Sequence, residues 1–553
     1  MNAEIIVSTL QPANENGVAS VDLTDVLGNC QLGEDFKNAG LRVDPYLAQY
    51  LAQYLHSLGA KTAVIENNYV DHDYLDDYSN YYAKCFDAPP RLCARVHFFS
   101  DVYAEKELKR IVTSPDMKGD DSPEGVDKLQ QHYLGFVVLR PLPRAMIGRT
   151  CLKPLLPGAG KSSKTVKASF WGLGLHVDAM PFQEQDTATA ACATCALWSA
   201  SQVTAALFGH AAYSPSRITV MAGGHKTSEM RVFPNGGLSL TDMIYAVRSM
   251  MLDPIHVGVQ IESDAQQQDI LLGNIYAYLG MGVPILLTGI LKREDGSSYG
   301  DGGHAVVING YECKDDFGDP KRSLISSGIY KLFVHDDQVG PYASIEFERK
   351  DLPGNAVACP CKGKCVRAID GSPKVMTRWR TEWDENGKPL YFSPLNLIIP
   401  VYNKIRVSYE DVRRYVIEIH DALDVVIKSL QKEGRLPNDK DFIFQWSIRL
   451  RTCCDYKKSV RNDPDIRLQQ DKLARLTMAL PKYLWEIKVF VNRKINALFV
   501  VDATDSGWGM RVVDAYMYYR NMEEMWNWLL LTKGNSRKMA RNPIFAKLKE
   551  IAG

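Results

Sequence analysis

The stretch that most constrains this chain runs from Gln185 to Gln202, with the sequence QDTATAACATCALWSASQ. A glutamine and a loop of small and polar residues precede Cys192, and strong helix formers follow it. The apolar residues between Leu197 and Leu207 recur at roughly helical spacing, which predicts a helix with Cys192 in its first turn. Unpaired N–H groups and the helix dipole favour a thiolate there, so the sequence indicates a cysteine that can act as a nucleophile.

Two downstream segments supply the groups that a cysteine nucleophile needs. An isolated cysteine on a helix more often packs as a small hydrophobe. Here, however, the segment DGGHAVVINGY at 301–311 predicts a glycine-rich loop that places His304 on the first residue of a buried strand. The segment YKLFVHDD at 330–337 predicts a second strand that ends at Asp336 and Asp337. A thiol, an imidazole and a carboxylate are the parts of a thiolate–imidazolium pair.

These motifs resemble those of papain-like cysteine peptidases. The match consists of Cys-x-x-Cys-x-x-Trp-Ser, Gly-His-Ala-Val-Val-Ile-Asn-Gly-Tyr and a strand that ends in Asp, and it covers about residues 175 to 350. It is especially similar to the bacterial branch that includes the bacteriocin-processing peptidases. The resemblance implies an α+β catalytic domain whose cysteine helix packs on an antiparallel sheet carrying the histidine and the aspartate. It also implies acyl transfer by Cys192, His304 and Asp336, with no cofactor and no metal ion.

The cysteine motif can be aligned with the family in two ways, which differ in the cysteine they select as the nucleophile. The papain frame selects Cys195 as the nucleophile, whereas the bacterial frame selects Cys192. The resemblance gives Gln185 the role of oxyanion donor; it lies seven residues before Cys192 and ten before Cys195, and the shorter interval is nearer that of the family. We favour Cys192, also because Cys195, one helical turn further on, should point toward the core.

The third member of the triad also has an alternative. Asp336 is the residue that the resemblance favours, and Asp337 is its alternative. Side chains alternate along a strand, so only one of these two neighbours is aimed at His304. Both carboxylates are otherwise consistent with a simple turn at the end of the strand.

Composition places the chain among ordinary globular proteins with several domains. At 553 residues it is too long for a single core. A net charge of zero argues against bulk electrostatic binding to nucleic acid or to a membrane, so the expected partner is a protein or peptide substrate. The N-terminus lacks the features of a secretion signal, and the twelve cysteines are scattered. Reduced cysteines and a cytoplasmic location are therefore expected.

The predicted organisation is a papain-like domain between two accessory domains. Residues 1–143 predict an α/β accessory domain, 144–350 the peptidase domain, 351–369 a cysteine-rich connector and 370–553 an α+β accessory domain. A further protein partner is possible through the accessory domains. In finer detail, we expect a strand near 148–152 to form a hairpin with 165–173 around a basic, mobile tip. The stretch 512–531 is expected to form an aromatic helix.

Two other clusters carry candidate metal ligands. Four aspartates lack the glycine and closing glutamate of a calcium loop, so a solvated or partner-facing acidic patch is favoured; they are Asp71, Asp73, Asp76 and Asp77. Three cysteines near the connector lack a fourth zinc ligand, so a reduced thiol-rich loop is favoured; they are Cys359, Cys361 and Cys365.

The main functional hypothesis is a thiol hydrolase that cleaves a peptide or isopeptide bond in another protein. A thiol-dependent acyltransferase or deamidase of the same fold is the first alternative. A binding or scaffold protein that keeps the fold without turnover is the second.

Overall fold

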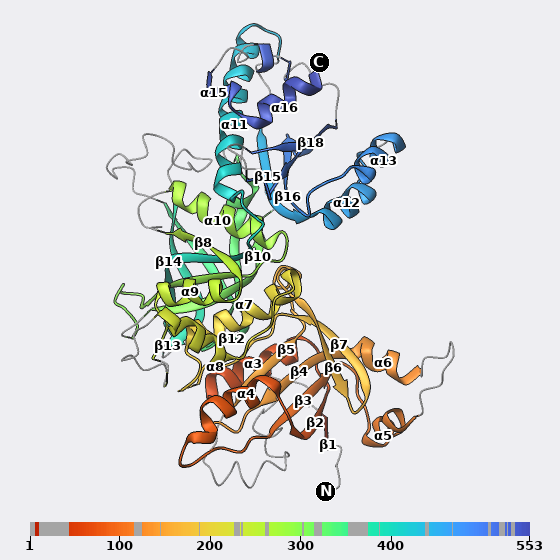
Figure 1. Ribbon diagram of the computed structural model, residues 1–553, viewed down its shortest axis with the longest axis vertical. Coiled ribbons are helices and arrows are strands. Elements are labelled where there is room, and N and C mark those ends of the chain that lie inside the picture. Colours follow the sequence, from red (N-terminus) through yellow and green to blue (C-terminus); the bar gives the residue numbers. More distant parts are fainter. Residues whose placement is uncertain are drawn as a thin grey trace.

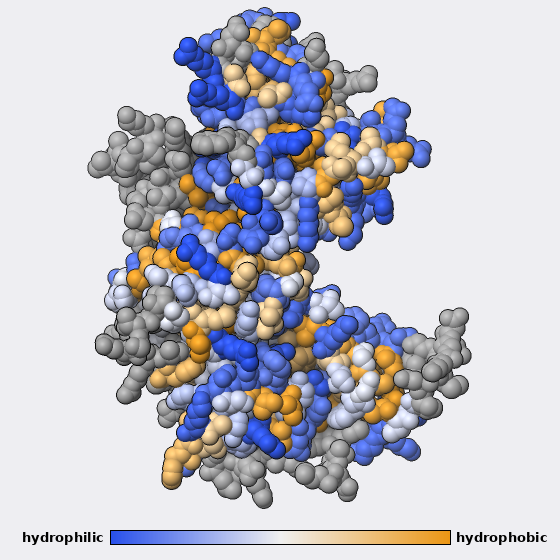
Figure 2. Space-filling view, in the orientation of Figure 1, coloured by the Kyte–Doolittle hydropathy of each residue, from blue (hydrophilic) through white to orange (hydrophobic). Residues whose placement is uncertain are grey.

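Three larger antiparallel sheets follow one another along the long axis of the molecule, with helices on and between them, and β6 (Lys164–Phe170) and β7 (Leu173–Ala179) form a fourth, two-stranded sheet (Figure 1). The computed structural model describes residues 6–9, 44–114, 124–143, 145–186, 188–225, 233, 236–259, 265–300, 303–314, 323–351, 374–385, 388–436, 442–466, 468–506, 510–518, 526–527, 529–531 and 537–552. The architecture is α+β, as the sequence predicts. None of the described helices is long and apolar enough to cross a membrane. Figure 2 shows that the outline is hollowed on one side, between the N-terminal and C-terminal parts.

The N-terminal sheet has five strands, in the order β1 (Ile6–Thr9), β2 (Thr62–Tyr69), β3 (Cys93–Phe99), β4 (Tyr133–Leu139) and β5 (Ile147–Leu152). Its helices are α3 (Pro45–Ser57), α4 (His72–Asn80), α5 (Glu105–Thr113) and α6 (Glu124–His132), and a short 3₁₀ turn, η1, spans Tyr82–Lys84. Asp44 caps α3 by accepting hydrogen bonds from two backbone N–H groups, and Gly59 follows the helix with a φ of 74°. Since β5 belongs to this sheet, the N-terminal unit extends past the predicted boundary at residue 143.

The predicted hairpin between 148–152 and 165–173 is wrong. β6 (Lys164–Phe170) pairs instead with β7 (Leu173–Ala179), while β5 pairs with β4. Trp171 and Gly172 both have positive φ, which matches a tight two-residue hairpin turn. β6 and β7 alternate buried and exposed residues, as strands with one solvated face do. β5 is almost wholly buried, so it belongs to a sheet that is covered on both faces.

The central sheet has seven strands, in the order β13 (Lys374–Glu385), β12 (Gly340–Asp351), β11 (Ile329–Asp336), β10 (His304–Cys313), β9 (Ile285–Lys292), β14 (Lys388–Tyr402) and β8 (Leu252–Gly258). β13 also pairs with β14, which closes six of the strands into a ring. The predicted boundaries at 350 and 370 therefore do not match the sheet, because β13 and β14 come from the stretch assigned to the C-terminal domain. Pairing between strands so far apart in sequence leaves no local signal.

Helix α7 (Cys192–Phe208) packs against this sheet and contacts β9, β10, β11 and β14. Its apolar side chains share a core with Leu286, Val307 and Ile398. α8 (Pro215–Ala222), the short turn η2 (Gly223–His225) and α9 (Leu240–Ser249) cover it, and Ser239 caps α9 in a capping box. The Cys192 helix is thus fixed on one face of the sheet whose strands carry His304 and Asp336.

The predicted acidic patch on α4 is wrong, because most of these carboxylates are buried and have partners within the chain. Asp71, Asp73 and Asp77 are buried. Asp73 accepts a hydrogen bond from the Trp198 indole at 2.8 Å and pairs with Arg149 at 2.7 Å. The others have local or similarly distant partners: Asp71 caps α4, Asp76 binds Arg217, and Asp77 accepts from the backbone N–H of Ser216. Most of these partners lie far away in sequence, so the composition of the segment alone indicated that the carboxylates face the solvent.

The C-terminal sheet has four strands, in the order β15 (Phe444–Thr452), β16 (Tyr483–Val491), β17 (Lys494–Asp502) and β18 (Val512–Met517). The helices of this unit are α11 (Tyr409–Lys432), α12 (Cys453–Asn462), α13 (Gln469–Thr477), α15 (Arg537–Ala540) and α16 (Pro543–Ala552). The predicted helix over 512–531 is wrong in its first part, which is β18, paired with β17, whereas residues 526–527 and 529–531 are helical as predicted. Aromatic residues occur in helices and in strands, and pairing with the neighbouring β17 decides for a strand here.

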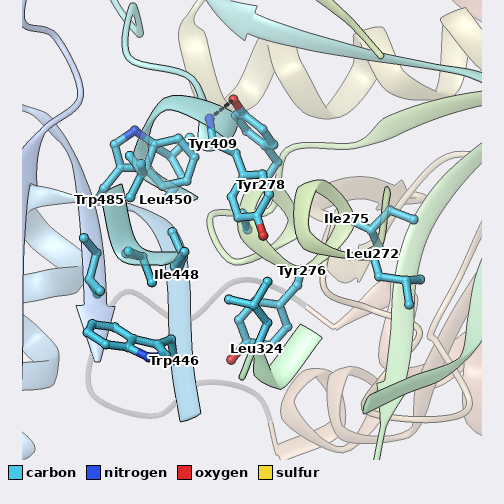
Figure 3. Packing of buried hydrophobic residues seen from close by; sticks show 14 of the residues in the cluster. Leu272, Ile275, Tyr276, Tyr278, Leu324, Tyr409, Trp446, Ile448, Leu450 and Trp485 are labelled. Carbon is cyan, nitrogen blue, oxygen red and sulfur yellow. Dashed lines mark hydrogen bonds between the residues drawn. The ribbon is translucent and has the colours of Figure 1, made fainter. Parts of the chain in front are cut away.

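Helix α10 (Ala265–Leu279) and the short turn η3 (Ile325–Gly328) join the central and C-terminal units. Tyr278 packs edge-on against Trp485, and its hydroxyl accepts a hydrogen bond from the backbone N–H of Tyr409 at 3.3 Å (Figure 3). These residues belong to one large apolar core that spans both units. The C-terminal unit is therefore packed firmly on the central one.

The segment 158–162, predicted as a mobile basic tip, packs against the central sheet. The Gly158 carbonyl accepts a hydrogen bond from the backbone N–H of Tyr311 at 3.1 Å, and the buried Ser162 hydroxyl donates to the Gly282 carbonyl at 2.8 Å. A Cβ atom at Gly310 would lie 2.0 Å from the Gly158 carbonyl oxygen, so the close approach requires glycine at that position. The expectation of mobility is wrong.

We predict that Asp73→Ala lowers the free energy of unfolding by about 3 kcal/mol, because it leaves Arg149 and the Trp198 indole without their shared carboxylate. Urea denaturation of the full chain measures this. Glu105→Gln, which breaks an exposed pair with Lys109, is the control and should change the free energy by less than about 0.5 kcal/mol. Equal effects for the two variants would contradict the anchoring role of Asp73.

Candidate active site

Cys192 is the first residue of α7, and its side chain is half-buried. Ala191 precedes it as N-cap and offers no side-chain acceptor, so the first-turn N–H groups are not occupied by a capping side chain. The Cys192 side chain contributes to the raised pKa of the His304 ring, so the two side chains are neighbours. The sequence predicted both the place of Cys192 in the first turn and its proximity to this histidine.

His304 is the first residue of β10, and Asp336 is the last residue of β11. The two strands are antiparallel neighbours, so the start of one and the end of the other lie at the same edge of the sheet. His304 Nε2 and Asp336 Oδ1 are 3.0 Å apart, and both side chains are buried. Since Nε2 is bound to Asp336, Nδ1 is the ring nitrogen left for the Cys192 thiol.

The surroundings of His304 favour its protonated form. Burial alone would lower the pKa of the ring. The charge and hydrogen bond of Asp336, with smaller contributions from Cys192 and Asp337, outweigh burial and hold the pKa well above its usual value. An imidazolium beside a half-buried thiol at a helix N-terminus is the arrangement that stabilises a thiolate.

Asp337 follows Asp336 in the turn after β11, and its carboxylate also lies near the His304 ring. Its carboxylate lines a small void together with Phe182, Gln183 and Cys195. Neither of its oxygens has a hydrogen-bond partner among the described residues. Burial raises its pKa to about 7, although His304 acts in the opposite direction. Of the two carboxylates, Asp336 is the one that accepts a hydrogen bond from the His304 ring.

Cys195 is buried at 3% exposure, in agreement with the expectation that it points toward the core. Its sulfur lies 4.0 Å from the side-chain nitrogen of Gln183. Burial and the charge of Asp337 raise the pKa of this thiol well above its usual value. Of the two candidate sulfurs, Cys192 therefore has the more suitable setting for a thiolate.

Gln185 lies in the extended segment before α7 and is half-buried. In the part of the chain that the structure describes, its side chain makes no hydrogen bond. The next residue, Asp186, organises the loop: its carboxylate accepts hydrogen bonds from the backbone N–H groups of Ala188 and Ala190 at 2.7 and 3.0 Å. Sequence reasoning missed Asp186, although an aspartate before Thr and Ala in a helix-entry loop is a recognisable turn signal.

Buried hydrogen bonds of Arg140 and Glu184 attach the segment before α7 to the N-terminal sheet. The Arg140 guanidinium donates to the Glu184 carbonyl at 3.0 Å, and the Glu184 carboxylate accepts from the backbone N–H of Ile147 at 3.1 Å. Burial raises the pKa of Glu184 to about 7. Arg140 and Glu184 carried no sequence signal, because their contacts join segments from different parts of the chain. The N-terminal unit thus helps to place Gln185.

A close approach between strands shapes the other side of His304. In the register of β9 and β10, Gly289 lies opposite His304, and the Phe392 ring of β14 packs edge-on to the imidazole. A Cβ atom at Gly289 would lie 2.4 Å from the Ser393 carbonyl oxygen and from the Phe392 ring. Glycine at 289 therefore allows the aromatic ring to shield the histidine.

Comparison with protein families, with curated proteins and with solved structures finds no match to this chain. The interpretation of the site therefore depends on its side chains. Potential ligand atoms of His304, Asp336 and Asp337 lie within 4.8 Å of one another, so this buried group has the residue types of a metal site as well. The three candidate zinc cysteines, Cys359, Cys361 and Cys365, lie outside the described residues.

The buried carboxyl of Asp337 predicts a pH-dependent stability. Because its folded pKa of about 7 exceeds the usual value of 3.8, the native state holds a proton that the unfolded chain releases between these pH values. Its contribution is therefore intact below about pH 4 and is lost as the pH rises toward 7. We expect Asp337→Asn to gain about 3 kcal/mol relative to the wild type between pH 4 and pH 8.

Urea denaturation across this pH range measures the gain. Asp253→Asn, at an exposed position on β8, is the control and should follow the wild type at every pH. A gain for Asp337→Asn that stays constant with pH would show that the carboxyl is not held protonated.

Proposed function

We propose that this protein is a papain-like thiol hydrolase that cleaves a peptide or isopeptide bond in a protein substrate. The observation that carries the proposal is the line of three groups from Cys192 to His304 to Asp336. The thiol at a helix N-terminus is within reach of a buried imidazole, whose other nitrogen is bound to a carboxylate at 3.0 Å. This is the arrangement that activates a cysteine nucleophile.

The reaction begins when the Cys192 thiolate attacks the substrate carbonyl carbon and forms a tetrahedral oxyanion. The imidazolium of His304 gives its proton to the departing amine as the carbon–nitrogen bond breaks, which leaves a thioester on Cys192. The now neutral ring accepts a proton from water, and the resulting hydroxide attacks the thioester. The carbon–sulfur bond then breaks, so that the acid product leaves and the Cys192 thiolate is released beside the imidazolium, which has kept the proton taken from water. Asp336 holds the ring with Nδ1 toward the sulfur.

The oxyanion needs donors that are placed before the reaction starts. The backbone N–H of Cys192 belongs to the first turn of α7, and the Gln185 amide has no hydrogen-bond partner within the described chain. Gln185 and Cys192 lie at the two ends of the loop that the Asp186 carboxylate organises. We assign these two groups to the oxyanion, with no cofactor and no metal ion in the reaction.

The substrate class and the location remain part of the proposal. A net charge of zero favours a protein or peptide over nucleic acid or a membrane, and a thiol nucleophile suits the reducing cytoplasm. A thiol-dependent acyltransferase or deamidase would use the same three residues, with another acceptor in place of water or a free amide in place of the peptide.

We predict that Cys192 is the preferred site of modification by iodoacetamide. Peptide mass mapping after brief labelling at pH 6 should find most of the label on Cys192, because it is half-buried beside the His304 imidazolium, whereas burial raises the pKa of the Cys195 thiol. Cys192→Ala should remove the rapid labelling, and Cys195→Ala should leave it in place. The opposite result would make Cys195 the nucleophile, whereas slow labelling of both would favour a scaffold protein.

We also predict that Asp336 and Asp337 differ in their effect on the reactivity of Cys192. Asp336→Asn removes the main charge that raises the pKa of His304, so the alkylation rate at pH 6 should fall about tenfold or more. His304→Ala should move the pH profile of alkylation toward that of a free thiol, near pH 8.5. Asp337→Asn is the matched control and should change the rate at pH 6 by less than about threefold.

The reaction itself can be read from the products. Mass spectrometry of a lysate treated with the wild type or with Cys192→Ala should reveal new peptide termini that only the wild type produces. One-dalton shifts without cleavage would assign a deamidase, and added acyl groups an acyltransferase. A lysate unchanged by a chain with a reactive Cys192 would count against all three reactions on its proteins.

A further inference from the structure

A cavity of about 410 Å³ lies where the central unit meets the C-terminal sheet. Tyr276 of α10 and Tyr311 of β10 line one side, and strands β15 and β16 line the other. Figure 3 shows Tyr276 and Leu324 at this junction, next to β15. The volume is within the range of small-molecule sites.

The strand face that lines the cavity is polar. On β15 every second residue points to it, and these residues are Gln445, Ser447, Arg449 and Arg451. The alternate residues are apolar and belong to the core; they are Phe444, Trp446, Ile448 and Leu450. A strand covered on both faces is normally apolar on both. Gln445 and Ser447 are buried nonetheless, so this face is suited to hold a polar occupant.

Among the described residues that line this face, cationic side chains outnumber carboxylates. On β16, the register places Glu486 opposite Arg449 and Lys488 opposite Ser447. Arg451 and Lys488 both approach the same oxygen of Glu486, at 3.6 and 3.8 Å. Arg449 instead lies over the Tyr276 ring at 4.5 Å. The Nε groups of both arginines have no hydrogen-bond partner in the described part of the chain.

Two more cations line the cavity from the central unit. Lys161 follows the packed segment at 158–160 and lies 4.5 Å from the centre of the Tyr311 ring. Lys314 comes directly after β10. The described lining thus combines five cationic side chains from two units with one carboxylate.

We propose that this cavity binds a small molecule that carries two or more phosphate groups. Arginine forks match phosphate oxygens with paired hydrogen bonds, and lysines add point charges. Several cations around one carboxylate call for an occupant with more than one negative charge. The Ser447 and Tyr276 hydroxyls, 2.9 Å apart, are additional polar groups on the wall. The volume of about 410 Å³ suits a small molecule better than a polymer.

Isothermal titration calorimetry of the full chain tests this, with inorganic triphosphate and a nucleoside triphosphate as separate probes. We expect saturable binding of at least one probe. Lys488→Gln and Lys161→Gln, from opposite walls, should each raise Kd about tenfold. Glu486→Gln removes the single described carboxylate and should lower Kd about fivefold. Lys458→Gln, at an exposed position on α12, is the control and should change Kd by less than about twofold.

Tighter binding of inorganic triphosphate would show that phosphates alone are recognised, and tighter binding of the nucleotide would show that the tyrosine-lined wall contributes. Both results support the proposal. The absence of saturable binding with both probes would overturn it, and so would equal weakening by Lys458→Gln and Lys488→Gln. Unchanged iodoacetamide reactivity of Cys192 in each variant serves as the check that the protein remains folded.

Discussion

The hydrogen bond between His304 and Asp336 is the interaction on which the candidate site depends. Both groups are buried, and an isolated charge in that setting would be strongly disfavoured. As a pair they stabilise one another, and the imidazole is held protonated next to Cys192. The fold supports this pair by joining β10 and β11 as antiparallel neighbours, so that their opposite ends meet at one edge of the sheet.

The units around the central sheet contribute to the same arrangement. The N-terminal unit holds α7 through Asp73 and Trp198, and it holds the segment before α7 through Arg140 and Glu184. The C-terminal unit shares a continuous apolar core with the central one. The flanking units are thus structural supports of the site.

The sequence was most informative where the signal was local. The Cys192 helix follows from a short pattern, and so does the delivery of His304 to the first residue of a strand. The catalytic assignment itself remains a proposal. Some errors concern partners that are distant in sequence: β14 inserts between β9 and β8. Another concerns the choice between helix and strand, since β18 pairs with the nearby β17 where a helix was expected. The buried role of Asp73 likewise depends on Trp198, which no window around residue 73 contains.

The insertion of β14 between β9 and β8 has a consequence for the order of events during synthesis. The cysteine helix and the histidine strand leave the ribosome well before residues 388–402 do. Until that strand arrives, β9 has an open edge, and the Phe392 ring that covers His304 is absent. A nascent chain therefore carries its reactive groups without the completed ring of strands, and the mature arrangement around the imidazole forms only late in translation.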